Sequence, residues 1–234
     1  MSEIAGRLAA IRARVTAAAG RAGRDPATVR LVGASNRQPI ERLRAAYDAG
    51  LRLFGENRVQ EGLAKAGDLP ADCEWHLLGP LQSNKVRKAL ERFTFFHAVD
   101  RVKIAQALDA EAAARGREAR ALVEINVGGE ASKHGFEPAD LARQLEPLAA
   151  LEHCRVVGLM TLPPPAADPE QARPHFRRLR ELAAELDRRP EWRGRMVELS
   201  MGMSDDFEVA IEEGATFVRL GTLLFGVRDP SDSG

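Results

Sequence analysis

Short apolar runs and longer amphipathic segments alternate along the chain. The apolar runs predict strands at 30–35, 51–55, 74–79, 93–98, 120–127, 154–160, 195–201 and 216–220. The segments between them repeat apolar residues with the spacing of a helix face, as do Leu179, Leu182, Ala183 and Leu186. The same spacing near the start of the chain predicts an N-terminal helix that carries Ile4, Leu8, Ile11 and Val15.

The alternation of strands and helices predicts parallel strands joined by crossover helices. Eight such units fit a closed (β/α)₈ TIM barrel, and we expect residues 1–234 to form a single barrel domain with an N-terminal helix. A doubly wound open sheet is the alternative, but no G-x-G-x-x-G follows the first strand. The proline-rich segment 161–174 follows the sixth strand, so we interpret it as a strand-to-helix loop and not as a domain boundary.

The charged residues balance, because the chain has 34 lysines and arginines and 34 aspartates and glutamates. Binding of nucleic acid or of an anionic membrane by bulk charge needs a basic excess, so both are excluded as the main partner. The arginines are interleaved with acidic residues on the predicted helices, which is typical of a solvated face. With 44% hydrophobic residues, the chain can bury a sizeable core.

The cysteines and the apolar runs bear on the compartment. Cys73 and Cys154 lie far apart in the sequence, which is typical of reduced thiols packed in a core. No apolar run approaches the roughly 20 residues that span a bilayer, and the first residues lack the pattern of a signal peptide. We therefore expect a cytoplasmic protein. The scattered histidines form no H-E-x-x-H motif, and we expect no metal site.

The functional residues of such a barrel lie at the C-terminal ends of the strands, and phosphate groups often bind after the last two strands. After the seventh predicted strand, Gly202 would let the backbone approach a ligand closely. Ser204 is the expected N-cap of the helix that follows. Arg219 in the eighth strand supplies a fixed positive charge, and Gly221 and Thr222 supply N–H and hydroxyl donors. These residues predict a site for a phosphomonoester.

Six segments resemble the motifs of one known family. They are LFGENRVQE (53–61), WHLLGPLQSNK (75–85), INVGGEASKHGF (125–136), GLMTLP (158–163), LSMGMSDDFEVAIEEGAT (199–216) and VRLGTLLFG (218–226). Together they cover nearly the whole chain in order, and they resemble the pyridoxal phosphate homeostasis proteins, the YggS/PROSC-like family. The resemblance implies a single (β/α)₈ barrel similar to the N-terminal domain of alanine racemases. It also implies binding of pyridoxal 5′-phosphate (PLP) and a carrier and regulatory role in vitamin B6 pools, without an established catalytic turnover.

The resemblance implies roles for the residues that match these motifs. Asn57 would line the pocket of the pyridine ring. The phosphate and the pyridine end of the cofactor would be held by Ser200, Gly202, Ser204, Arg219, Gly221 and Thr222. This set includes the residues that strand order alone assigns to a phosphate site.

The chain departs from the family pattern at the first strand. The family reads V-S-K-T-K-P there, and its first lysine forms a Schiff base with PLP. This chain reads GASNRQP over 33–39, with Asn36 at the position of that lysine. An amide is no nucleophile for an aldehyde, and the guanidinium of Arg37 stays protonated and should point to the opposite face of the strand. A second departure is Arg58, where tyrosine is common in the family.

Three interpretations stay open. In the first, PLP or a related B6 vitamer binds non-covalently, because charge-assisted hydrogen bonds to the phosphate remain a strong anchor. In the second, another lysine forms the Schiff base, and Lys85 and Lys133 lie just past strand ends. In the third, the barrel takes a different phosphorylated ligand or has a regulatory role without a ligand.

A binding protein is the first functional hypothesis. A PLP-dependent racemase needs two bases beside its substrate, and the alanine racemases take one of them from a second, β-rich domain that the predicted barrel does not include. We therefore expect no racemase activity and no catalytic residue of that kind. The alternative is an enzyme or regulator that acts on another phosphorylated small molecule. The acid–base candidates of such an enzyme are Glu56, His76, Lys85 and Lys133, although His76 is more typical of a core histidine bonded to the backbone.

Overall fold

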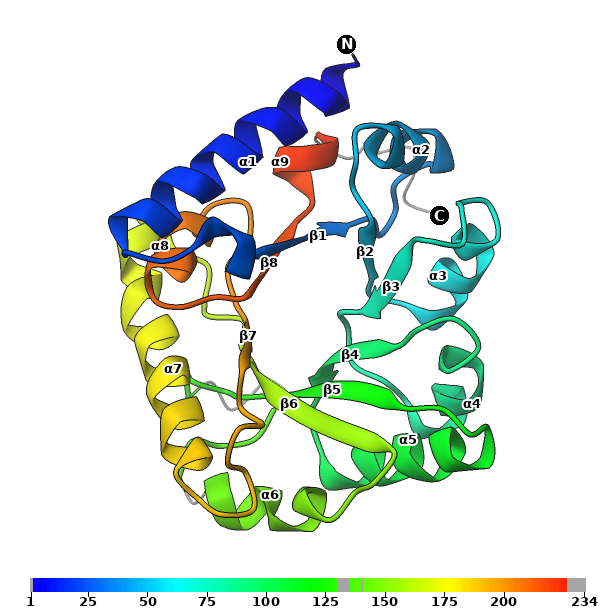
Figure 1. Ribbon diagram of the computed structural model, residues 1–234, viewed down its shortest axis with the longest axis vertical. Coiled ribbons are helices and arrows are strands. Elements are labelled where there is room, and N and C mark those ends of the chain that lie inside the picture. The colour runs from blue at the N-terminus through cyan, green and yellow to red at the C-terminus, as the bar shows by residue number, and fades with distance from the viewer. Residues whose placement is uncertain (1, 130–134, 140, 227–234) are drawn as a thin grey trace.

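Eight parallel strands close into a barrel with helices on its outside (Figure 1). The computed structural model describes residues 2–129, 135–139 and 141–226. The strands are β1 (Arg30–Ala34), β2 (Leu53–Glu56), β3 (Glu74–Leu77), β4 (Phe95–Val99), β5 (Ala119–Glu124), β6 (Cys154–Met160), β7 (Glu198–Ser200) and β8 (Phe217–Leu220). The α-helices are α1 (Glu3–Arg21), α2 (Ile40–Asp48), α3 (Val59–Ala66), α4 (Val86–Ala89), α5 (Val102–Ala114), α6 (Leu141–Ala149), α7 (Arg173–Asp187), α8 (Phe207–Glu212) and α9 (Thr222–Phe225). Three short 3₁₀-helices are η1 (Pro26–Thr28), η2 (Ser83–Lys85) and η3 (Pro169–Ala172).

The (β/α)₈ fold predicted from the sequence is confirmed. Each predicted strand overlaps an observed strand, and the strands pair in chain order. β1 also pairs with β8, from Arg30 opposite Phe217 to Gly33 opposite Leu220, and this pairing closes the sheet. The doubly wound open sheet is therefore wrong. β7 is shorter than the predicted run, and Val197, directly before it, is 59% exposed although its N–H still bonds to the carbonyl oxygen of Val157 in β6.

The N-terminal helix is confirmed as α1. The side chain of Ser2 accepts a hydrogen bond from the N–H of Ala5 at 3.2 Å and caps the helix. The apolar face packs across α2, α8 and α9 (Figure 1), and its buried residues include Ile4, Leu8, Ile11 and Val15. Each fully buried aliphatic side chain of this kind contributes roughly 1.5–3 kcal/mol. α1 therefore covers the barrel near the junction of β1 and β8.

Alternate residues of each strand point into the barrel, where the apolar ones form one cluster. The interior cluster consists of Val32, Leu78, Phe95, Ala98, Leu122, Val157, Met160 and Phe217. At the N-terminal end of the barrel, Glu198 pairs with Arg30 and, at 3.5 Å, with Arg120. The guanidinium carbon of Arg30 lies 3.8 Å from the ring centroid of Phe217. Paired side chains therefore fill this end of the barrel.

The loop after β1 is held by a group of polar residues that we call the Lys65 cluster, made of the buried Ser35 and Glu56 and the half-buried Glu61 and Lys65. From α3, Nζ of Lys65 lies 2.7 Å from the carbonyl oxygen of Ser35, 2.9 Å from Oε1 of Glu56 and 2.7 Å from Oε1 of Glu61. The hydroxyl of Ser35 donates to Oε1 of Glu56 at 2.7 Å. Because Ser35 directly precedes Asn36, the cluster fixes the point at which the chain leaves β1.

Glu56 makes the stability of this cluster depend on pH. Burial raises the pKa of Glu56 from 4.5 to about 7, although Lys65 and Ser35 act in the opposite direction. The carboxyl group of Glu56 therefore stays protonated to a higher pH in the folded protein than in the unfolded chain. The contribution of Glu56 to stability is complete below about pH 4.5 and is lost as the pH rises through about 7. Above that range, the ammonium of Lys65 compensates for the buried carboxylate.

We expect Lys65→Met to lower the free energy of unfolding by about 3 kcal/mol near pH 8, because it leaves a buried carboxylate without its counter-charge. The loss is smaller near pH 5, where Glu56 is protonated. Urea unfolding at both pH values measures the two losses. Lys88→Met, at an exposed lysine of α4, is the control and stays within about 0.5 kcal/mol of the wild type. An equal loss at both pH values contradicts this account of Glu56.

Candidate functional site

A cavity of about 320 Å³ opens at the C-terminal end of the barrel, and we call it the mouth cavity. The residues that line it lie at the C-terminal ends of six of the eight strands or in the loops after them. They are Ala34, Asn36, Asn57, Leu78, Leu162, Met203, Ser204, Asp205, Arg219, Gly221 and Thr222. The volume lies at the lower end of the roughly 300–1,000 Å³ that is typical of small-molecule sites. Its size and mixed lining therefore fit a small polar ligand with an apolar part.

Most of the residues predicted for the site meet in this cavity. Its lining includes Asn36, Asn57, Ser204, Arg219, Gly221 and Thr222. Ser200 and Gly202 lie directly behind the lining. Oγ of Ser200, which is fully buried, accepts a hydrogen bond from Nη1 of Arg219 at 2.5 Å. The carbonyl oxygen of Gly202 accepts from the backbone N–H of Arg219 at 3.0 Å. Both residues therefore hold Arg219 and are not part of the cavity wall.

Arg219 is a buried positive charge at the wall of the mouth cavity. It is 5% exposed, and its Nη2 donates to the carbonyl oxygen of Thr161 at 3.0 Å. Burial lowers the pKa of Arg219 to about 10, while Asp206 and Glu124 act in the opposite direction. The guanidinium therefore remains protonated at neutral pH. A buried cation beside a cavity favours a ligand that is anionic or accepts hydrogen bonds.

The expected N-cap role of Ser204 is wrong. α8 begins at Phe207, and its N-cap is Asp206, whose carboxylate accepts from the N–H of Met203 at 2.6 Å. The sequence predicts that α8 begins in this segment. The contact between Asp206 and Met203 instead holds the segment in a turn before the helix. Oγ of Ser204 instead accepts from the N–H of Leu223 in α9 at 3.2 Å. Ser204 therefore ties the loop after β7 to α9, and both segments border the mouth cavity.

Gly202 is needed for the packing of α8 against the loop after β7. Its φ is +92°, in the left-handed region, and an added Cβ would lie 2.5 Å from Cβ of Ala210 and 3.0 Å from Cα of Phe207. This glycine therefore permits the close contact between the loop after β7 and α8.

An amide faces the mouth cavity from the end of β1. Asn36 is 9% exposed and belongs to the cavity lining, whereas the next residue, Arg37, is exposed. Both residues lie in a turn after β1 ends at Ala34, and Arg37 has a φ of +59°, so this turn separates the two side chains and the strand alternation expected from the sequence does not apply. Asn57 enters the lining from the end of β2, where Gly79 leaves room for its backbone, since a Cβ at Gly79 would lie 2.5 Å from the Asn57 carbonyl oxygen.

No lysine among the described residues lines the mouth cavity. Lys85 lies in η2, away from the lining, and Lys133 lies outside the described residues. Lys65, which no motif of the sequence assigns to the site, contacts the residue before Asn36. Lys65 approaches from α3, outside the barrel wall, and its amine is bound by two carboxylates, so it does not serve the cavity. In the sequence, Glu61 and Lys65 are four residues apart, and this spacing predicts an ion pair on one face of a helix.

Two residues considered as acid–base groups at the mouth lie elsewhere. Glu56 faces α3 within the Lys65 cluster. His76 lies in the barrel interior, where its Nδ1 is 2.9 Å from Nε2 of His97. The expected backbone partner of His76 is therefore wrong, because a second histidine ring takes its place. The mouth cavity includes neither Glu56 nor His76 in its lining.

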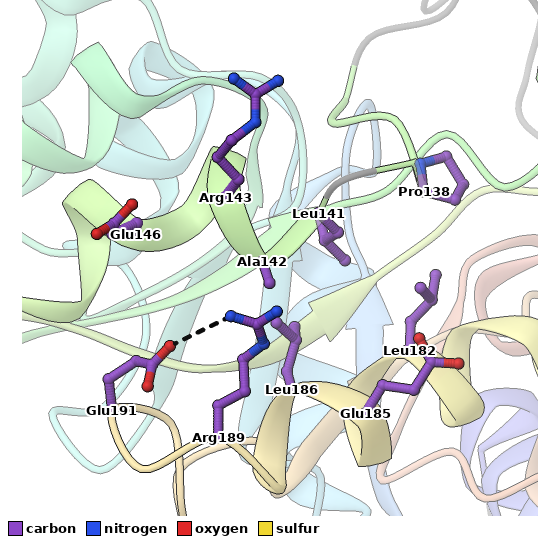
Figure 2. Close-up of a pocket in the computed structure, with 10 residues that line it drawn as sticks. All are labelled: Pro138, Leu141, Ala142, Arg143, Glu146, Leu182, Glu185, Leu186, Arg189 and Glu191. Atoms are coloured by element: carbon purple, nitrogen blue, oxygen red, sulfur yellow. Dashed lines mark ion pairs between the residues drawn. The ribbon is translucent and has the colours of Figure 1, made fainter.

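A second concavity, of about 460 Å³, lies on the outside of the barrel between α6 and α7 (Figure 2). Leu141 of α6 and Leu182 and Leu186 of α7 supply apolar lining. At its edge Arg189 and Glu191 pair at 3.7 Å. This groove contains none of the residues that the sequence motifs single out, so the mouth cavity is the candidate site.

Within the ranges that the structure describes, no group of three or more histidines, cysteines or carboxylates could hold a metal ion. Cys73 and Cys154 are both buried and free. Among the same described residues, no helix combines the length and the apolar character needed to cross a membrane.

Sequence comparison matches the chain over most of its length. Residues 7–229 match the family model of the alanine racemase N-terminal domain. The pyridoxal phosphate homeostasis protein of Aquifex aeolicus is 47% identical over 95% of this chain and 97% of the relative. The protein of the same name from Pseudomonas aeruginosa is also 47% identical, over 98% of this chain and 97% of the relative.

Solved structures agree with this match. PipY of Synechococcus elongatus, at 41% identity, covers 96% of this chain, with TM-scores of 0.85 for the structure without PLP and 0.83 for the structure with PLP bound. An alanine racemase of Clostridium difficile, 17% identical, has a TM-score of 0.69 over 87% of this chain and shares the fold. The barrel, the motifs and the full-length identity lead to one conclusion: the chain belongs to the family of pyridoxal phosphate homeostasis proteins, built on the alanine racemase N-terminal domain.

Proposed function

We propose that this chain binds pyridoxal 5′-phosphate, or a related B6 vitamer, non-covalently in the mouth cavity and acts in vitamin B6 homeostasis without catalytic turnover. The observation that carries the proposal is the convergence of motif residues from β1, β2, β7 and β8 on one cavity beside the buried charge of Arg219. Family membership supports the choice of ligand, because curated relatives are named for pyridoxal phosphate and PipY has a structure with PLP bound.

The cavity offers suitable chemistry for both parts of the vitamer. For the phosphate, Ser204 and Thr222 supply hydroxyl groups, and Gly221 supplies a backbone N–H. Arg219 supplies the positive charge that balances an anion or that donates to a ring nitrogen. Leu78 supplies an apolar surface for the ring. These roles are part of the proposal, and Asn57 completes it at the edge of the ring.

Asn36 determines how the vitamer is held. Its amide can donate to or accept from the polar groups of the ring, but it cannot form a covalent bond with the aldehyde. Lys65, the lysine next to this strand end, is held by three oxygen acceptors on the outer side of the wall. Lys85 is not part of the lining. The phosphate contacts therefore carry the affinity, and the complex is reversible.

An enzyme that acts on another phosphorylated small molecule is not favoured, because Glu56 and His76 do not line the cavity. The proposal takes residues 1–234 as one functional domain, located in the cytoplasm, with a small phosphorylated ligand as its partner. The balance of 34 basic and 34 acidic residues supports a role that does not involve nucleic acid.

Titration of the purified protein with stoichiometric PLP in a calorimeter is expected to give saturable binding. Borohydride reduction of the same mixture, followed by mass spectrometry, is expected to give no adduct, because the described part of the chain places no lysine in the cavity lining. An adduct on Lys85 or Lys133 would support the second interpretation instead. Absence of binding for PLP, pyridoxine phosphate and pyridoxamine phosphate alike would contradict the proposed function.

Asn36→Lys is expected to give a yellow complex with PLP that borohydride fixes at position 36, because the side chain there faces the cavity. Absorbance spectra and mass spectrometry after reduction measure this gain. Asn36→Gln, which lengthens the side chain without adding an amine, is the matched control and stays colourless. If Asn36→Lys folds and binds PLP but cannot be reduced to an adduct, the aldehyde does not lie at this strand end.

Arg219→Met keeps most of the side-chain volume and removes the charge. We expect it to weaken PLP binding about 10- to 100-fold, the equivalent of a lost charge-assisted hydrogen bond. Calorimetry measures the affinity, and thermal unfolding checks the fold. Arg58→Met, at the exposed N-cap of α3, is the control and binds like the wild type. An unchanged affinity of Arg219→Met would remove Arg219 from the proposed site.

A further inference from the structure

A line of polar groups runs through the apolar interior of the barrel. From the mouth cavity, Nη1 of Arg219 donates to Oγ of Ser200 at 2.5 Å, and this Oγ lies 2.8 Å from Nδ1 of His97. Nε2 of His97 lies 2.9 Å from Nδ1 of His76. Nε2 of His76 lies 3.7 Å from Oε2 of Glu74, whose side chain is 65% exposed at the start of β3. Hydrogen bonds thus connect residues of β8, β7, β4 and β3, and the carboxylate of Glu74 lies beyond hydrogen-bond distance at the far end of this line.

The two ends of this line fix the direction of its hydrogen bonds. A guanidinium only donates, and an ionised carboxylate only accepts. The carboxylate of Glu74 therefore favours a proton on Nε2 of His76, so that Nδ1 of His76 accepts from Nε2–H of His97. Nδ1 of His97 then accepts from the hydroxyl of Ser200, and the hydroxyl oxygen accepts from Arg219. With both rings neutral, this direction gives each of the three hydrogen bonds between Arg219 and His76 a donor and an acceptor. Nε2 of His76 has no hydrogen-bond partner among the described residues, and the Glu74 carboxylate lies nearby at 3.7 Å.

The surroundings of the two rings agree with this assignment. His76 and His97 are 1% and 0% exposed and pack against Phe95 and Phe217. Burial lowers the pKa of His76, and burial, with His76 and Arg219 nearby, holds the pKa of His97 well below its usual value. A polar group in such a layer is costly unless its hydrogen bonds are made. Loss of one link therefore affects the groups on either side of it.

We propose that His97, supported by His76, is a positioning residue for the vitamer: through Ser200 it holds the guanidinium of Arg219 in the orientation that meets the ligand. The proposal rests on the proposed function, because it concerns the same cavity. Ser200 binds Nη1 of Arg219 and the Thr161 carbonyl binds Nη2, and these two contacts together fix the plane of the guanidinium. Without His97, the hydroxyl of Ser200 can rotate, and Thr161 alone does not fix that plane.

The two ring nitrogens of His97 can be replaced separately. In His97→Asn the amide lies near the place of Nδ1, where it can accept from Ser200 but cannot reach His76. In His97→Gln the amide lies near the place of Nε2, where it can meet His76 but not Ser200. Ser200→Ala breaks the line with little change in volume. Ser83→Ala, at an exposed serine of η2, is the matched control.

The affinity of the full-length protein for PLP is measured by calorimetry, and thermal unfolding reports the stability of each variant. We expect His97→Gln and Ser200→Ala to bind PLP about tenfold more weakly than the wild type, and His97→Asn to stay within about threefold of it. The two His97 variants are expected to lose similar stability. A purely structural role of His97 would not separate them in affinity.

An affinity of His97→Asn as low as that of His97→Gln overturns the proposal, because the effect would then not pass through Ser200. Wild-type affinity of Ser200→Ala overturns it as well, and this variant decides alone if the His97 variants do not fold. Absence of PLP binding by the wild type overturns the proposed function, and the role of His97 falls with it. A wild type that binds and variants that bind equally well leave the proposed function intact and remove only this inference.

Discussion

The guanidinium of Arg219 lies where the apolar interior of the barrel meets the mouth cavity, and a charge in that position is costly without partners. The chain supplies them from neighbouring strands: Ser200 at the end of β7, the Thr161 carbonyl just past β6 and the Gly202 carbonyl for its backbone N–H. The same contacts set the shape of the cavity. The contacts that hold the charge of Arg219 at the site therefore also link β8 to β6 and β7.

Two polar groups support the cavity from opposite sides of the barrel wall. The Lys65 cluster lies outside, between the strands and α3, and holds the end of β1 next to Asn36. The histidines lie inside and reach Arg219 through Ser200. Barrels of this class fill their interior mainly with apolar branched residues. Departures of a chain from its local pattern are expected mainly at functional sites. The Lys65 cluster and the buried histidines are two such departures, and both support the same cavity.

The sequence predicts the barrel well, because the alternation of short apolar runs and helical segments leaves few other solutions. It also predicts that Asn36 and Arg219 approach the same end, because parallel strands bring their C-terminal ends together. It does not predict on which side of the wall a residue lies, since a shift of one position reverses the face. Glu56 and Asn57 are neighbours, yet only Asn57 lines the cavity.

Other features depend on contacts between distant segments, which the sequence does not display. Lys65 lies on a helix and meets the end of β1 only in the folded chain. Asp206 takes the N-cap position that local rules assign to Ser204, and its carboxylate binds the N–H of Met203 in the preceding loop. The contacts of Ser200 with His97 and Arg219 form only when β4, β7 and β8 come together in the folded barrel.

The most direct test of the account is a crystal structure of the protein grown with PLP. The account predicts a vitamer in the mouth cavity, with its polar groups within hydrogen-bond distance of Arg219 and Asn36 and with no electron density joining its aldehyde carbon to a lysine. Continuous density from that carbon to any lysine, or a vitamer bound outside the mouth cavity, would contradict it.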